Sequence, residues 1–287
     1  PYLTLGHYWS ISKKLIIQTN LYAINGRTAN TNLNWFNAND PRPDYYKYLP
    51  SYFINNQGSL SGNQIIENQA DYNQILQGWQ QNNPNTTQLN WDLMYNANYN
   101  NLYTQNDIGG EGGNSLTARR SKYILEEYRL DPRHYGFNSF GKWNVNENSN
   151  LNFGVSISNY KSKNFRLMND LLGGDYWVDI DQFALRDFDD PNLAQNDLQN
   201  PNKIIKVGDV FGYNYDIHIN KNELFSTYSF NKNRIETFFG INLSNTTFWR
   251  NGKMQNGRFP ENSLGNSEKQ TFLNYGAKFG FLYKITG

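Results

Sequence analysis

Apolar and polar residues alternate with a period of two over long stretches of this chain, and this pattern constrains the fold more than any other feature. In residues 151–158, Leu151, Phe153, Val155 and Ile157 are apolar, whereas the residues between them are small or polar. A period of two places successive side chains on opposite faces of a β-strand. The segment therefore predicts a strand with one apolar face and one polar face.

Six further segments alternate in the same way, so an all-β chain is expected. In the segment near residue 280, every second residue from Leu273 to Ile285 is apolar or aromatic. The predicted strands cover residues 2–11, 14–27, 134–145, 151–165, 213–230, 234–250 and 271–285.

One predicted strand changes its pattern part-way along. In residues 213–230 the apolar positions switch parity between Ile219 and Leu224. An extra residue in a strand moves all later side chains to the other face. We therefore expect a β-bulge near Lys221 and Asn222.

Composition excludes several classes of protein. Mean hydropathy is −0.78 although only 18% of residues are charged, because 47 residues are asparagine. The aromatic content of 16% argues against intrinsic disorder, and the balance of 26 basic and 25 acidic residues argues against a nucleic-acid partner. The longest aliphatic run, Leu15–Ile17, is far too short for a membrane-spanning helix. The absence of cysteine removes disulfides and thiolate metal sites.

The connections between predicted strands alternate between short and long. Short turns at one end and long loops at the other are typical of outer-membrane β-barrels. We therefore expect an antiparallel transmembrane β-barrel segment, with about seven strands of a larger barrel and extracellular loops that contain short helices. Residues 1–287 are interpreted as part of one barrel domain, with the plug and the remaining strands absent. The short connections are 12–14, 146–150 and 231–233, and the long loops are about 28–133, 166–212 and 251–270.

The first long loop carries local structure of its own. Apolar residues recur at helical spacing between Ile65 and Trp79, which predicts an amphipathic helix near 64–80. A second helix is expected to start near Asn90, and residues 116–126 are expected to be extended.

Aromatic residues gather near the ends of the predicted strands. Two girdles of aromatic side chains are expected where a barrel crosses the membrane interfaces. The alternative interpretation is a set of core aromatics in a soluble β-sandwich. The candidates near the short turns are Trp9, Trp143, Phe230 and Tyr283, and those near the long loops are Phe165 and Trp249.

Catalytic patterns are poor in this sequence. His7, His134 and His218 lack metal-ligand spacing, and the glycine-rich segment 109–113 lacks the Lys-Ser/Thr of a phosphate loop. Paired carboxylates are frequent, but chance pairs are expected in loops this long. We therefore expect no enzymatic activity.

Two loop segments are candidates for ligand or partner contact. The first is a proline-restricted corner that contains Arg42 between two carboxylates, and the second is rich in aspartate and aromatic residues. Oxygen ligands at this density suit calcium, although their order does not match a helix-loop-helix site; no other cofactor or metal is expected. The candidate residues are Arg42, Asp44, Tyr45, Tyr46, Asp175, Tyr176, Trp177, Asp179 and Asp181.

A third loop segment is basic. Arg119, Arg120 and Lys122 are candidates for contact with lipopolysaccharide phosphates if they flank the outer leaflet. An ordinary solvated run of charges is the alternative interpretation of the same residues.

Four motifs carry a resemblance to a known family. The stretches 39–46 (NDPRPDYY), 173–179 (GGDYWVD), 256–260 (NGRFP) and 267–270 (SEKQ) resemble the barrel region of TonB-dependent receptors of Bacteroidota, which are distant relatives of SusC/RagA-type importers. The likeness runs from about residue 14 to residue 285. The resemblance implies a 22-stranded barrel around an N-terminal plug, driven by TonB, and in some members capped by a surface lipoprotein.

Three functions follow as hypotheses. The first is part of an outer-membrane transporter that imports a glycan, a peptide or a metal chelate, with lipid, TonB and other outer-membrane subunits as partners. The second is a barrel component of a larger outer-membrane assembly whose loops bind partner proteins. The third is a secreted sugar-binding β-domain. The first two place the chain in the bacterial outer membrane as a multi-pass β-barrel.

Overall fold

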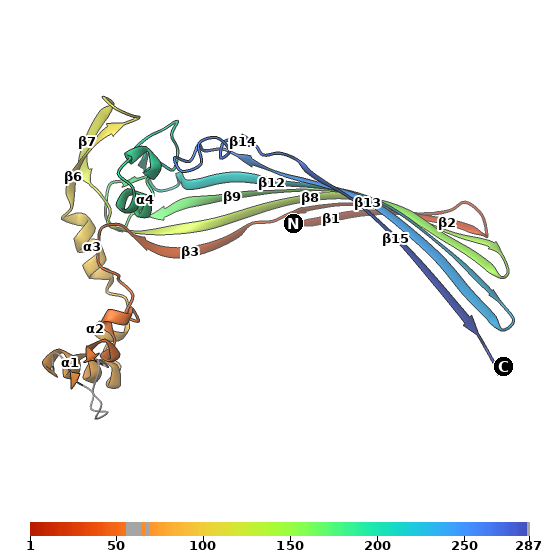
Figure 1. Cartoon of the computed structure of the whole chain (residues 1–287), viewed down its shortest axis with the longest axis horizontal. Coiled ribbons are helices and arrows are strands. Elements are labelled where there is room, and N and C mark those ends of the chain that lie inside the picture. Colours follow the sequence, from red (N-terminus) through yellow and green to blue (C-terminus); the bar gives the residue numbers. More distant parts are fainter. Residues whose placement is uncertain (56–64, 67–68, 286–287) are drawn as a thin grey trace.

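The computed structural model describes residues 1–55, 65–66 and 69–285. A long, curved antiparallel sheet dominates the chain, and helices and loops gather at one end of its strands, whereas tight turns close the other end (Figure 1). These two ends are called the loop end and the turn end. The prediction of a mostly antiparallel β chain is confirmed.

All seven predicted strands are present in the sheet, in which each strand pairs with its neighbour in an antiparallel manner. Strand β3 (Thr28–Trp35) lies beside β8, and β14 (Gly265–Asn266) lies beside β13. The main path runs through β1 (Tyr2–Ser10), β2 (Leu15–Asn25), β8 (Tyr123–Asn146), β9 (Ser149–Asp170), β12 (Val210–Lys232), β13 (Ile235–Gly252) and β15 (Gln270–Tyr283).

The predicted loop boundaries at 28–133 were wrong. Strand β8 begins at Tyr123, and β3 pairs with its first half from Thr28↔Leu130 to Trp35↔Tyr123. The N–H of Gly26 donates to the carbonyl of Pro132 (2.9 Å), so β3 carries on alongside β8 from the end of β2. The alternation in β3, TANTNLNW, is weak because Thr31 stands among Ala29, Leu33 and Trp35 on the less polar face, so this strand was not predicted. The loop at 166–212 is also shorter than predicted, since β9 ends at Asp170 and β12 begins at Val210.

The predicted bulge near Lys221 and Asn222 was also wrong. Pairing of β12 with β13 is continuous from Tyr215 to Lys232, and the register shift lies between Phe211 and Asn214 instead. The apolar side chains of β12 therefore change face along an unbroken strand. The parity switch in the sequence marks a change in what each face contacts, not an inserted residue.

Short elements fill the long loops, and α1–α3 form an arm that leads away from the sheet (Figure 1). The predicted second helix is confirmed as α3, where Asn90 caps the helix by accepting from the N–H of Leu93 (2.9 Å). The predicted first helix is observed as α1, and its expected start near 64 lies outside the described residues. Residues 116–126 are extended on both sides of a break at 120–122. The elements are η1 (Tyr46–Tyr48), η2 (Pro50–Phe53), β4 (Ile54–Asn55), β5 (Ile65–Ile66), α1 (Gln69–Gln80), α2 (Pro84–Thr87), α3 (Trp91–Tyr99), β6 (Leu102–Ile108), β7 (Asn114–Arg119), β10 (Trp177–Val178), α4 (Gln182–Asp187), η3 (Pro191–Ala194) and β11 (Ile204–Ile205).

The buried core lies at the loop end. One cluster joins the ends of β8 and β9 to β10 and β11, and a second packs α3 against β8. Asn98 of α3 is fully buried, and its amide donates to the carbonyls of Tyr123, Leu171 and Leu172 while its oxygen accepts from the N–H groups of Lys122 and Tyr123. This side chain therefore ties the arm to the sheet. The clusters are Ile124, Met168, Leu171, Trp177, Ile205 and Phe211, and Met94, Tyr123 and Leu172.

Candidate functional site

The lower part of the sheet, toward the turn end, presents one continuous apolar surface. Residues that pair directly across antiparallel strands point to the same face. The register therefore assigns the faces without ambiguity, and it aligns six apolar residues of six strands in one row: Leu15, Trp143, Leu151, Tyr228, Phe239 and Phe279.

Rows above and below extend this surface, which is called the apolar band. Its exposed side chains include Leu224 (55%), Ile241 (51%) and Phe279 (71%), so no other described residue covers them fully. The band consists of Leu3, Leu5, His7 and Trp9 of β1; Leu15, Ile17, Thr19, Leu21 and Ala23 of β2; Tyr135, Phe137, Ser139, Gly141 and Trp143 of β8; Leu151, Phe153, Val155 and Ile157 of β9; Leu224, Ser226, Tyr228 and Phe230 of β12; Ile235, Thr237, Phe239, Ile241 and Leu243 of β13; and Leu273, Tyr275, Ala277, Phe279, Phe281 and Tyr283 of β15.

The two faces differ in charge at the same height. The band contains no Asp, Glu, Lys or Arg, and Lys232, in register with Ile235, lies at its lower edge. Two of its hydroxyls, Thr19 and Ser139, hydrogen-bond to each other across strands (3.0 Å). On the opposite face, called the polar face, Lys142, Glu223 and Lys278 interrupt the same strands. The alternation seen in the sequence therefore becomes a division of the whole sheet.

All six aromatics that were predicted at the interfaces project from the apolar side of the sheet. Those near the turns, Trp9, Trp143, Phe230 and Tyr283, lie at the lower edge of the apolar band. Trp249 lies just beyond the upper edge, where it stacks on His218 at 4.7 Å between ring centroids, and Phe165 lies farther toward the loop end beneath Arg129. No helix within the described part of the chain is long and apolar enough to cross a membrane.

A cavity of about 1010 Å³ opens on the polar face at the loop end, and it is called the loop-end pocket. Strand β3 and the upper halves of β8 and β9 form its floor, with Asn32, Asn34, Glu126, Tyr128 and Arg166 continuing the polar face. The loop before η1 and the segment from β10 to α4 form its sides. Two loops that are far apart in the sequence therefore meet over one part of the sheet.

The charges of the loop-end pocket balance. Three basic and three acidic side chains line it: Arg42, Arg166 and Arg186, and Asp40, Glu126 and Asp181. Arg166 lies 3.4 Å from Glu126 and against the rings of Tyr128 and Phe211. Asn34 donates to the same Glu126 carboxylate (3.0 Å). The floor is thus fixed by hydrogen bonds and ion pairs, and it offers both polar groups and aromatic faces.

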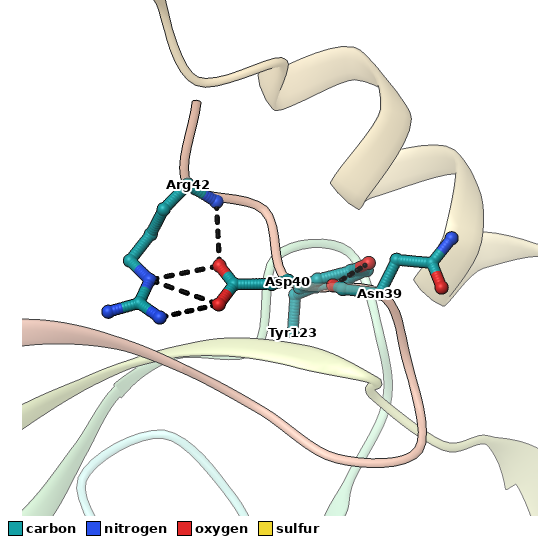
Figure 2. Close-up of polar contacts among 4 residues, drawn as sticks. All are labelled: Asn39, Asp40, Arg42 and Tyr123. Carbon is teal, nitrogen blue, oxygen red and sulfur yellow. Dashed lines mark hydrogen bonds and ion pairs between the residues drawn. The ribbon is translucent and has the colours of Figure 1, made fainter. Parts of the chain in front are cut away.

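The proline-restricted corner is held by an ion pair. Figure 2 shows that the Arg42 guanidinium and backbone N–H both donate to Asp40, and that Tyr123 donates to the carbonyl of Asn39 (2.8 Å). The hydrogen bonds from the Arg42 side chain hold the pKa of Asp40 below its usual value, against the opposing effect of burial. Arg42 therefore pairs with the first of its two flanking carboxylates, and Asp44 is exposed to solvent.

The structure brings four of the nine predicted contact residues together. Arg42, Tyr45, Trp177 and Asp181 line the loop-end pocket, although Trp177 is almost fully buried and Asp181 also caps α4. The side chains of Asp44 and Tyr46 lie outside the pocket lining. The prediction that the segments 42–46 and 175–181 act in ligand contact is not tested by this placement.

The remaining three predicted residues have structural partners. Asp175 accepts two guanidinium hydrogen bonds and one backbone hydrogen bond from Arg119, and these lower its pKa to about 2. Tyr176 is fully buried and donates to the carbonyl of Tyr103 (3.1 Å). Asp175 and Tyr176 therefore fasten the β6–β7 hairpin to the loop cluster.

Asp179 is buried beside the pocket wall. Its Oδ1 accepts from the N–H of Gly212 and from the Asn196 amide, both at 2.8 Å, whereas its Oδ2 has no hydrogen-bond partner among the described residues. Burial raises the pKa of this carboxyl group. The carboxyl group therefore anchors the start of β12 to the loop at 196.

Aspartates of the 170–190 segment are dispersed among turns, caps and ion pairs. Asp170, Asp181 and Asp190 accept from nearby backbone N–H groups, and Asp187 pairs with Arg186. The described residues contain no group of three His, Cys, Asp or Glu side chains that could hold a metal ion.

Two of the three basic residues at 119–122 have partners within the loop cluster. Arg119 pairs with Asp175, and the Arg120 guanidinium lies over the rings of Phe36 and Tyr103. These two arginines therefore hold the loop cluster together, and the expected contact with lipid phosphates finds no support at their positions.

Sequence reasoning missed the floor of the pocket. Asn32 and Asn34 belong to a strand whose alternation is weak, and Glu126 and Arg166 lie far apart in the sequence. One available signal was the recurrence of charged residues with a period of two, at Glu127, Arg129 and Asp131 and at Lys161 and Lys163, which extends the neighbouring strands. No protein-family model, no curated protein and no solved structure matches this chain. The functional proposal therefore rests on the apolar band and the loop-end pocket.

Proposed function

We propose that this chain forms part of the wall and outer loops of a TonB-dependent outer-membrane transporter, of the kind that its motifs resemble. The observation that carries the proposal is the apolar band, an uncharged surface that crosses seven strands while the opposite face of the same strands is charged. A lipid bilayer stabilises such a surface, whereas water does not.

The dimensions of the apolar band agree with this proposal. On β15 it runs from Leu273 to Tyr283, ten residue steps or about 34 Å along the strand at ~3.4 Å per residue. Strands that tilt by about 40° would give a band of about 26 Å along the membrane normal, close to the ~25 Å typical of outer-membrane barrels. The lower edge descends from Leu15 on β2 to Ile235 on β13, as tilted strands require.

The loop-end pocket supports a role in solute binding. Its balanced charges, amide side chains and aromatic faces suit a polar ligand of low net charge, such as a glycan, a peptide or a metal chelate. The exposed Phe183 and Arg186 are in the best position for contact with a solute that enters from the loop end. Coupling to TonB would then involve parts of the receptor other than this chain. We propose no enzymatic step and no cofactor.

Site-directed spin labelling tests the membrane proposal, and the cysteine-free sequence makes single-cysteine variants straightforward. Ile157→Cys and Phe239→Cys report on the apolar band, and Ser158→Cys and Phe238→Cys are the adjacent controls on the polar face. In lipid vesicles we expect the band labels to collide with oxygen and the control labels with a water-soluble nickel chelate. Band labels shielded from both reagents would instead indicate a closed protein core, as in the secreted sugar-binding alternative.

A role in a larger assembly is the second candidate, because the arm leaves aromatic and aliphatic side chains uncovered. Leu93, Tyr95 and Tyr99 of α3 are exposed, as is Tyr52 of η2. Photo-crosslinking from position 95 in intact cells distinguishes the two roles. Crosslinks to another protein favour assembly, whereas their absence together with solute uptake favours an independent transporter.

A further inference from the structure

A row of basic side chains lies on the apolar side of the sheet, above the upper edge of the apolar band. On β8 it directly follows the band, whereas one polar residue separates it from the band on β9 and two separate it on β12 and β13. Arg133 of β8, Lys161 of β9 and His218 of β12 pair in register with one another, and Trp249 of β13 completes the row. The Lys269 ammonium group lies 4.8 Å from the centre of the Trp249 ring. These four basic residues are called the basic row. Each projects from the same face as the band.

The acidic partners on this face do not neutralise the basic row. Lys161 pairs with Asp216 at 2.9 Å, and Arg129 pairs with Asp131 at 2.9 Å. Arg133, Lys163 and Lys269 have no ion pair among the described residues, and all three are exposed. Toward the loop end from the band, basic side chains outnumber acidic ones on this face of the described strands β8, β9 and β12 and of the residues that flank β13 and β15. The basic residues are Arg129, Arg133, Lys161, Lys163, Lys253 and Lys269, and the acidic residues are Glu127, Asp131 and Asp216.

An apolar groove of about 560 Å³ lies immediately below Arg133 and Lys161. It forms because Ala23 stands in register between the larger Leu3 and Tyr135, so a small side chain leaves a hollow in the surface. The walls of the groove include Leu5, Leu21, Phe137 and Ile157. Each basic residue is the next residue on the same face of its strand after a residue that lines the groove. Arg133 follows Tyr135 on β8 in this way, and Lys161 follows Asn159 on β9.

We propose that the groove and the basic row together bind one phosphorylated membrane lipid, with an acyl chain in the groove and headgroup phosphate on Arg133 and Lys161. A guanidinium group binds phosphate through paired hydrogen bonds, and an apolar hollow of this size accommodates part of an acyl chain. Neither the groove nor the row alone selects such a ligand. Their direct contact matches a molecule that joins an anion to a hydrocarbon chain. This inference rests on the proposed membrane orientation.

Native mass spectrometry of the protein in detergent tests the proposal, with bisphosphorylated lipid A as the probe. We expect retention of bound lipid to fall at least fivefold in Arg133→Gln/Lys161→Gln, and to fall similarly in Ala23→Phe, which fills the groove. The matched controls are Lys13→Gln/Lys232→Gln, which removes two charges at the turn end, and Ala277→Phe, which enlarges a band residue at the far edge. Both controls should retain the lipid as the parent protein does.

Three results would overturn the proposal. They are equal retention in the test and control variants, equal retention of lipid A without phosphates, and full displacement of the lipid by inorganic phosphate, which cannot occupy the groove. The spin-label experiment separates this outcome from failure of the membrane proposal. If the band labels contact lipid but lipid A is not retained, the transporter wall stands and the lipid site does not.

Discussion

Phe239 and Phe238 offer a direct measurement of what each face of the sheet contacts. They are adjacent on β13, they are the same residue, and their exposed fractions are similar, 50% and 43%. Phe239 belongs to the apolar band and pairs with Tyr228 and Phe279. Phe238 lies on the polar face between Ser229 and Gly280, and its ring covers Gly280.

The depth of Phe239 sets the expected magnitude. It lies four residues from each end of the band on β13, at Ile235 and Leu243, which is about 14 Å along the strand in each direction. With a strand tilt of about 40°, Phe239 lies roughly 10 Å from each edge of the band along the membrane normal, near the middle of the membrane. Lysine at the midplane of a barrel costs about 2–4 kcal/mol, whereas lysine on a wet face costs little. The difference corresponds to about a 30- to 1000-fold change in the folding equilibrium.

The assay is urea titration of folding into lipid vesicles for Phe239→Lys, Phe238→Lys and the two corresponding alanine variants. Alanine removes the ring without adding charge, so the difference between lysine and alanine isolates the cost of the charge at each position. We expect about 2–4 kcal/mol at 239 and less than about 0.5 kcal/mol at 238. Equal differences at the two positions, or a larger one at 238, would refute the assignment of the band to lipid.

Three further predictions concern the loop end. Asn98→Ala should destabilise the loop cluster by about 3 kcal/mol, because buried carbonyl and N–H groups lose their partners, whereas Asn96→Ala at an exposed position should have little effect. Hydrogen exchange of α3 measures both effects, and equal effects would contradict the role of Asn98. Because the pKa of Asp175 is depressed to about 2, its ion pair with Arg119 should hold the β6–β7 hairpin above pH 4 and release it as pH falls toward 2. Pepsin cleavage within residues 102–119 should rise as the pH falls through this range, whereas the Asp175→Asn variant should be cleaved similarly throughout it. Burial raises the pKa of Asp179, so its contribution to stability is complete below the ordinary value of 3.8 and declines as pH rises through the elevated pKa; Asp179→Asn should remove this dependence in thermal unfolding measured at several pH values. At pH 7, Asp179→Ala should be less stable than Asp179→Asn by about 1–3 kcal/mol, because alanine deprives the N–H of Gly212 of its acceptor. The opposite order would count against the buried-acid interpretation.

The strands of the apolar band could be predicted from the sequence because a period of two is a local property. Once Leu151, Phe153, Val155 and Ile157 share one face, no other part of the chain is needed to identify that strand. Alternation in the predicted strand 134–145 likewise places Trp143 on the apolar side. The local sequence also predicted a helix that starts near Asn90, and in the structure Asn90 caps α3.

Tertiary structure alone decided the loop end. Strand β3 has only Leu33 and Trp35 as large apolar side chains, so its pairing with β8 is what distinguishes it from a loop, and that pairing brings Asn34 to Glu126. The parity switch in β12 has a related origin: the strand keeps β9 and β13 as its neighbours, but near the loop end its aromatic side chains lie on the polar face, where Tyr213 stacks on Tyr128. Sequence alternation determined which residues share a face wherever one face is uniformly apolar. The pocket depends on contacts between residues far apart in the chain, and no local period encodes those contacts.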